Sequence, residues 1–177
     1  MINNKIITNS SKGFTLLELI IVFTVIAILS SIGIASFVGY SRSQTVQTAA
    51  YDLQNTLSLA KSKAMSQVKP TVCASTAALL GYRVDLDTGN GTYKILVICS
   101  DGQFNPLSGN NETTLPTAVS FDTNKTDTFS VFFPVITSGV IGSGEIVLKG
   151  FSDEKYSRWL CITANGVVKV SAVAHCL

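Results

Sequence analysis

Few side chains in this sequence of 177 residues have the types and spacing that enzyme chemistry requires. The single histidine, His175, is accompanied by no phosphate-binding glycine loop and no convincing Ser-His-Asp arrangement. Asp85 and Asp87 precede a glycine-rich turn, but their spacing fails the EF-hand calcium pattern. A hairpin turn explains these residues without metal, and a weak calcium site is the alternative. The sequence therefore predicts no enzyme, no metal centre and no cofactor.

The cysteines form a second group of reactive side chains: Cys73, Cys99, Cys161 and Cys176. No C-x-x-C pair is present, and one histidine is too few for an ordinary zinc site. In a domain exported across a membrane, four cysteines indicate two disulfides, for which three connectivities exist. We favour Cys73–Cys99, joining two early strands, and Cys161–Cys176, closing the open end of a C-terminal hairpin.

The most unusual carboxylate is Glu18, because it lies near the start of a long apolar segment. Glu18 is the only charged residue in residues 14–38, and residues 19–41 contain none. A helix over residues 14–38 is about 37 Å long, enough to cross a bilayer core of about 30 Å. A carboxylate inside hydrocarbon costs about 2.5–3.5 kcal/mol and usually has a partner. The simplest partner for Glu18 is a positive charge created when the chain is cut.

The flanking charges predict how this segment is oriented. Lys5 and Lys12 precede it, so the positive-inside rule places the N-terminus in the cytoplasm and the C-terminal domain outside. A secretory signal peptide has a shorter apolar region, and a plain single-span anchor leaves Glu18 unexplained. We therefore expect a single-pass protein of the cytoplasmic membrane.

At residues 12–18 the sequence reads KGFTLLE, which resembles the processing site of type IV prepilins and type II secretion pseudopilins. The resemblance implies that residues 1–13 are a leader, removed by a prepilin peptidase between Gly13 and Phe14. It also implies N-methylation of Phe14, and pairing of Glu18 with the Phe14 amine of a neighbouring subunit in a filament. Loss of the leader leaves eleven basic and eleven acidic residues, so the mature side chains sum to zero.

The helical pattern continues past the apolar segment. Apolar residues recur at steps of three and four along one face: Val46, Ala49, Ala50, Leu53, Leu57, Ala60 and Ala64. Pro70 ends the helix by Val68. We expect residues 14–40 to span the membrane or lie in a filament core, and residues 41–69 to form an amphipathic continuation.

A stripe of small residues lies in the first half of the expected helix: Ala27, Ser31, Ala35 and Gly39. Their spacing of four places them on one helical face. Small residues at this spacing let helix backbones approach closely in an apolar medium, so the stripe predicts packing against neighbouring helices.

Residues 70–177 contain short β-branched and aromatic runs that predict an antiparallel β domain packed on the amphipathic half of the helix. The expected fold class is therefore α+β. The expected strands cover residues 72–74, 82–86, 93–99, 119–122, 129–133, 145–148, 159–162 and 167–173. Turn residues predict hairpins at residues 87–91 and at Asn165-Gly166, and glycine and proline predict a loop over residues 100–118.

The hairpin at residues 158–170 resembles the closing hairpin of the H-type (GspH/FimT) minor pseudopilins and minor pilins. This resemblance implies a structural subunit of a type IV pilus or a type II secretion pseudopilus. The implied partners are other pilins or pseudopilins, the prepilin peptidase, an inner-membrane assembly platform and the cytoplasmic membrane. The subunit would move from that membrane into the pilus or pseudopilus.

A DNA-binding minor pilin in DNA uptake is the alternative. Some members of this group bind DNA, and a Gly-Arg-x-Arg segment near this hairpin is implicated. Here the matching residues are Gly166, Val167, Val168 and Lys169, so both arginines are missing. The zero net charge of the mature chain also argues against binding of nucleic acid.

Overall fold

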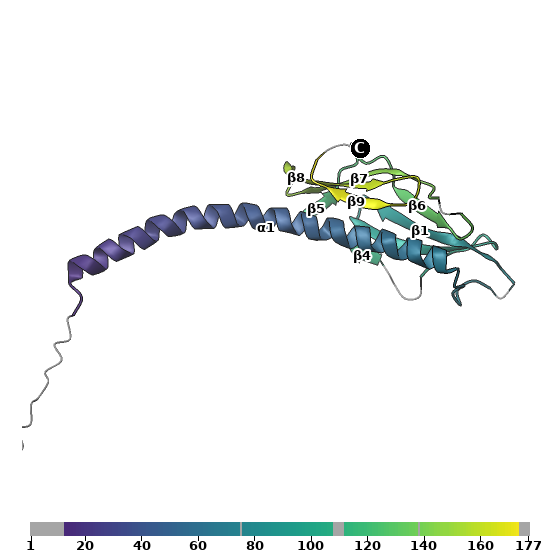
Figure 1. The fold of residues 1–177 in the computed structure, drawn as a ribbon, viewed down its shortest axis with the longest axis horizontal. Coiled ribbons are helices and arrows are strands. Elements are labelled where there is room, and N and C mark those ends of the chain that lie inside the picture. The colour runs from purple at the N-terminus through teal and green to yellow at the C-terminus, as the bar shows by residue number, and fades with distance from the viewer. Residues whose placement is uncertain (1–12, 75, 108–111, 138, 174–177) are drawn as a thin grey trace, which may run out of the picture. The chain divides into compact units, whose positions relative to one another are not determined.

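The computed structural model describes residues 13–74, 76–107, 112–137 and 139–173 (Figure 1). Within these ranges one helix, α1 (Leu16–Ser66), precedes a set of strands. The strands are β1 (Leu79–Asp87), β2 (Thr92–Cys99), β3 (Phe104–Pro106), β4 (Glu112–Thr114), β5 (Val119–Phe121), β6 (Ser130–Pro134), β7 (Gly144–Gly150), β8 (Asp153–Ile162) and β9 (Val168–Ser171). This order confirms the predicted α+β class. The chain divides into two compact units between Tyr40 and Ser41, so α1 has a first part in one unit and a second part in the other.

The first part of α1 leaves its large apolar side chains exposed. Leu16 and Leu17 are 76% and 70% exposed, and Ile20, Phe23 and their neighbours are at least half exposed. These aliphatic residues favour a helix but find no apolar surface within the described part of the chain. None of the helices that the structure describes combines the length and the apolarity that a membrane crossing requires.

The second part of α1 carries the predicted buried face. Every position of that face is buried: Val46, Ala49, Ala50, Leu53, Leu57, Ala60 and Ala64. The helix ends at Ser66, because Gln67 adopts a left-handed conformation (φ 52°) and Pro70 follows shortly after. Its end therefore comes slightly before the predicted limit at Val68.

The β domain consists of two antiparallel sheets. One has the strand order β3-β2-β1-β6, with β4 also pairing with β2, and the other has the order β5-β7-β8-β9. The β1–β2 hairpin closes with Asp87 opposite Thr92, and the β8–β9 hairpin closes with Ile162 opposite Val168. Gly166 has φ 66°, which the turn between β8 and β9 requires. Both predicted hairpins are confirmed.

Two details of the strand prediction were wrong. Residues 72–74 form turns rather than a strand, since the Cys73 amide donates to the Pro70 carbonyl at 3.2 Å. Residues 100–118 are not wholly loop, because β3 and β4 pair with the two halves of β2. Both strands are only three residues long, and β4 is polar and exposed, so neither has an apolar pattern that would identify it.

A disulfide joins Cys73 to Cys99, with the two Cα atoms 5.8 Å apart. The pairing is the favoured one, but Cys73 lies in the turn after α1, so the bond does not join two strands. It ties that turn to the end of β2. The second expected pairing, Cys161–Cys176, and His175 involve residues outside the described part of the chain, and that pairing stays a prediction.

The second part of α1 lies alongside strands of both sheets (Figure 1). The Gln54 amide donates to the Val168 carbonyl of β9 at 2.8 Å. The Lys61 ammonium donates to the carbonyls of Asn165 and Gly166 at 3.0 Å each. On the other sheet, buried Tyr93 of β2 hydrogen bonds with Thr56, and its burial raises the phenol pKa. One helix face thus closes the core of both sheets.

Candidate assembly site and surface pocket

The predicted processing junction is open to solvent. Gly13 and Phe14 precede the first residue of α1 and adopt no regular structure, and Phe14 is 84% exposed. A Cβ added at Gly13 would meet no atom within 4 Å among the described residues. The fold therefore leaves this peptide bond accessible and places no steric requirement on Gly13.

Thr15 fixes the start of the helix directly before Glu18. The Glu18 amide donates to the Thr15 hydroxyl oxygen at 3.2 Å, so Thr15 is the N-cap and Glu18 occupies the first turn. A carboxylate is stabilised there by the positive end of the helix dipole. Sequence reasoning missed this role of Thr15. The signal was available, because Thr followed by Glu three residues later is the capping-box pattern.

The small-residue stripe lies wholly within α1. Ala27 is exposed and Gly39 is half-buried, whereas the surroundings of the Ser31 and Ala35 side chains are outside what the structure describes. The packing of the stripe against neighbouring helices stays a prediction.

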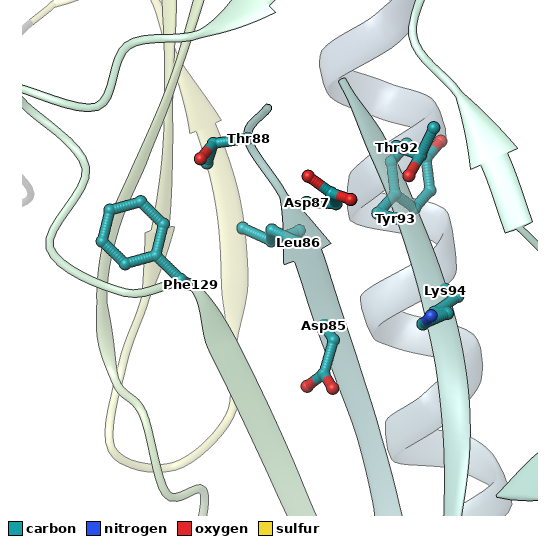
Figure 2. Close-up of a pocket in the computed structure, with 8 residues that line it drawn as sticks. All are labelled: Asp85, Leu86, Asp87, Thr88, Thr92, Tyr93, Lys94 and Phe129. Atoms are coloured by element: carbon teal, nitrogen blue, oxygen red, sulfur yellow. The ribbon is translucent and has the colours of Figure 1, made fainter. Parts of the chain in front are cut away.

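The β1–β2 hairpin borders a surface pocket of about 450 Å³ (Figure 2). Figure 2 shows Asp85, Asp87 and Lys94 on these two strands, with Phe129 across the pocket. The Thr92 hydroxyl at its edge donates to the Glu112 carboxylate at 2.6 Å. The lining combines two acids, three hydroxyl groups, one lysine and the apolar side chains of Leu86 and Phe129. A cation could bind here only if the two carboxylates were available to it.

Both carboxylates already have partners within the chain. Asp85 receives two contacts of 2.7 Å from the Arg83 guanidinium. Asp87 accepts from the amides of Gly89 and Asn90 at 3.0 and 3.1 Å, and from the Asn90 side chain at 2.8 Å. The Asn90 side chain is the main reason why the Asp87 pKa is lowered. These contacts match the hairpin-turn interpretation, and no cluster of three metal-binding side chains exists in the described ranges.

The C-terminal hairpin uses its polar groups within the fold. The carbonyls of its turn accept from Lys61, as described above, and Lys169 is exposed on β9. Val167 is 43% exposed at the position where the DNA-binding pattern has its first arginine. Of the two arginine positions in the DNA-binding pattern, only the second carries a positive charge here, that of Lys169.

The prokaryotic N-terminal methylation motif matches residues 8–34. Two solved structures of the minor pseudopilin EpsH from the type II secretion system of Vibrio cholerae resemble this fold. One covers 76% of this chain and 98% of its own, with a TM-score of 0.50 and 15% identity. The other covers 73% and 98%, with a TM-score of 0.48 and 16% identity. No curated protein sequence is significantly similar.

The methylation motif covers residues 8–34, and the likeness to EpsH at 15% identity shows a shared fold.

Proposed function

We propose that this protein is a minor pilin or pseudopilin, a structural subunit that assembles into a type IV pilus or pseudopilus through its N-terminal helix. The single observation that carries the proposal is the exposure of the first part of α1. The leucines, isoleucines and phenylalanines whose exposure the structure describes there are at least half exposed, although a single buried leucine is worth about 1.5–3 kcal/mol. Lipid and then neighbouring subunits are the surroundings that would cover them.

The proposal assigns a role to each part of the chain. Residues 1–13 are the leader that the prepilin peptidase removes, and residues 14–40 anchor the subunit in the cytoplasmic membrane before assembly. Residues 41–69 attach the β domain, residues 70–177, outside the membrane. The methylation motif supports the membrane anchor and the later filament. The peptidase and the assembly platform follow from the same proposal.

Glu18 provides the test of assembly. The proposal pairs it with the Phe14 amine of an adjacent subunit, and removing one member of a buried pair costs about 3–5 kcal/mol. Glu18→Ala should still enter the membrane and lose its leader, because the junction at Gly13 is unchanged. Its recovery with partner pilins after detergent extraction should fall about a hundredfold or more.

Asp52→Ala is the matched control, since Asp52 is an exposed acid on the second part of the same helix. It should leave membrane retention, cleavage and recovery with partner pilins unchanged. Undiminished recovery of the Glu18→Ala variant would contradict the proposed register role of this carboxylate.

A further inference from the structure

The turn between β7 and β8 has an unusual backbone. Phe151 and Ser152 both adopt left-handed conformations, with φ 56° and 55°. Two-residue hairpin turns of this kind normally contain Asn and Gly, because a bulky side chain at positive φ is strained. Strain of this kind persists only where the surroundings fix the conformation, and it clusters at functional positions.

Three features hold the turn in place, and one of them involves α1. Gly150 allows close approach, because a Cβ there would collide with the Val46 side chain of the helix. The Phe151 amide donates to the Ala118 carbonyl at 2.7 Å, and the Phe151 ring meets the Tyr156 ring edge-on with centroids 6.0 Å apart. Even so, Phe151 remains 36% exposed. The turn is thus held so that an aromatic ring faces outward.

Cations gather around this ring. The Arg42 guanidinium lies 5.0 Å from the Phe151 centroid, and the Lys155 ammonium lies 5.9 Å from the Tyr156 centroid. Arg158 donates to the Ser43 hydroxyl at 2.8 Å, which places a third cation near the same turn of the helix. We call Arg42, Phe151, Lys155, Tyr156 and Arg158 the basic-aromatic surface.

The neighbouring acids are engaged elsewhere. Glu154 pairs with Lys125 at 2.7 Å, and this contact lowers the Glu154 pKa. Asp153 accepts from the Lys155 backbone amide at 3.0 Å, and no ion pair between described residues joins its carboxylate to the Lys155 ammonium. Among the described residues, no ion pair neutralises Arg42, Lys155 or Arg158. The surface therefore carries positive charge that no described carboxylate neutralises through an ion pair.

The position of Arg42 in the sequence indicates what the basic-aromatic surface contacts. Arg42 is the first charged residue after the uncharged segment of residues 19–41. If residues 14–40 anchor the subunit, as the proposed function requires, Arg42 and the turn packed on it lie at the boundary between lipid and water. Aromatic rings and basic side chains are enriched at this boundary, where the cations meet anionic headgroups.

We propose that the basic-aromatic surface binds the phosphate groups of anionic phospholipids while the subunit is held in the membrane. Arg42, Lys155 and Arg158 supply the charge complementarity, and Phe151 lies at headgroup level. The contact orients the β domain on the membrane before assembly. This inference rests on the proposed function, because it needs the membrane anchor.

Tryptophan quenching tests the contact in the full-length chain. Trp159→Phe removes the single native tryptophan, and Phe151→Trp places a probe on the surface. The protein is reconstituted into phosphatidylcholine vesicles, with or without phosphatidylglycerol, that contain a headgroup-level spin-labelled lipid. The Phe151→Trp probe should be quenched more strongly with phosphatidylglycerol, and added salt should reduce the difference. Arg42→Gln and Lys155→Gln should each weaken the contact about fivefold.

Ile136→Trp in the same background is the matched control. Ile136 is 88% exposed, and the adjacent Val135 contacts Gln67, just beyond the C-terminal end of α1. This control probe should be quenched equally in both kinds of vesicle. If the surface probe in an inserted chain is quenched no more than the control probe, the inference alone is overturned. Failure to insert into either vesicle would overturn the proposed function and the inference with it.

Chemical labelling of lysine amines tests the same contact in the wild-type chain, without any tryptophan substitution. Lys155 should be protected in vesicles with phosphatidylglycerol, whereas exposed Lys94 on β2 should label equally in both. Protection of Lys155 that arises only after partner pilins are added would assign the surface to a protein contact, and would overturn the lipid proposal.

Discussion

The two parts of α1 contain the same kinds of apolar residue in opposite surroundings. Leu16 and Leu17 are at least 70% exposed, whereas Leu53 and Leu57 are fully buried against the sheets. Helix propensity does not distinguish these leucines. The second part finds its apolar partners within the chain, and the first part requires partners from outside it. From this comparison we propose that stability and assembly depend on separate stretches of one helix.

Truncating one leucine in each part gives the largest separation of the two roles. Leu53→Ala should lower the free energy of unfolding of the β domain by about 2–5 kcal/mol, because it leaves a cavity at a fully buried site. Leu17→Ala should leave that free energy unchanged, since its side chain contributes no burial there. Thermal unfolding of both full-length variants in detergent measures the difference.

The same two variants should differ in the opposite sense during assembly. Leu17→Ala should reduce recovery with partner pilins, while any Leu53→Ala protein that remains folded should assemble normally. A loss of domain stability in Leu17→Ala equal to that in Leu53→Ala would contradict the separation of roles.

The disulfide should stabilise only the β domain and the second part of α1 that packs on it. Replacing both Cys73 and Cys99 with serine removes the constraint on the turn after α1, at an expected cost of about 2–4 kcal/mol in the free energy of unfolding. A chemical denaturation curve of the double variant measures the loss. Membrane retention and leader removal should not change, because both depend on the first part of α1 and the residues before it. An unaltered denaturation midpoint would show that the bond contributes nothing to the domain.

Gly150 should show a smaller effect that depends on the helix contact. Gly150→Ala forces a methyl group against Val46 and should cost about 1–3 kcal/mol of domain stability. Gly89→Ala is the control, because its Cβ would meet only Asp87, at 3.4 Å, an ordinary contact distance. Adding Val46→Ala to Gly150→Ala should cost less than the two single losses combined. If the two losses of stability simply add, the strain in Gly150→Ala does not arise from contact with Val46.

The sequence predicts the helix well because its signal is local. The buried face from Val46 to Ala64 repeats at the helical period, and every member of it is buried in the structure. The Asp87–Gly91 and Asn165-Gly166 turns are equally local and are confirmed. The Cys73–Cys99 pairing was favoured among several connectivities, and the structure contains it.

Long-range features could not be predicted in the same way. No local pattern indicates that β6 pairs with β1, whereas β5 joins β7 in the other sheet. The run at residues 72–74 is apolar like a strand, yet its cysteine is buried through the disulfide. The left-handed turn at Phe151 contains no glycine to signal it. For the proposed assembly site, sequence spacing singles out Glu18, and the partner that we propose for it lies on another subunit.

Mass spectrometry of the mature protein tests the central claim most directly, namely that residues 1–13 are a leader and Phe14 is the working N-terminus. We expect loss of residues 1–13 and one added methyl group on the Phe14 amine. Gly13→Leu should retain the leader, and because a Cβ at this position meets no atom of the described residues within 4 Å, that retention reports recognition by the peptidase. An intact Met1 in the wild-type protein, or normal maturation of Gly13→Leu, would contradict the account.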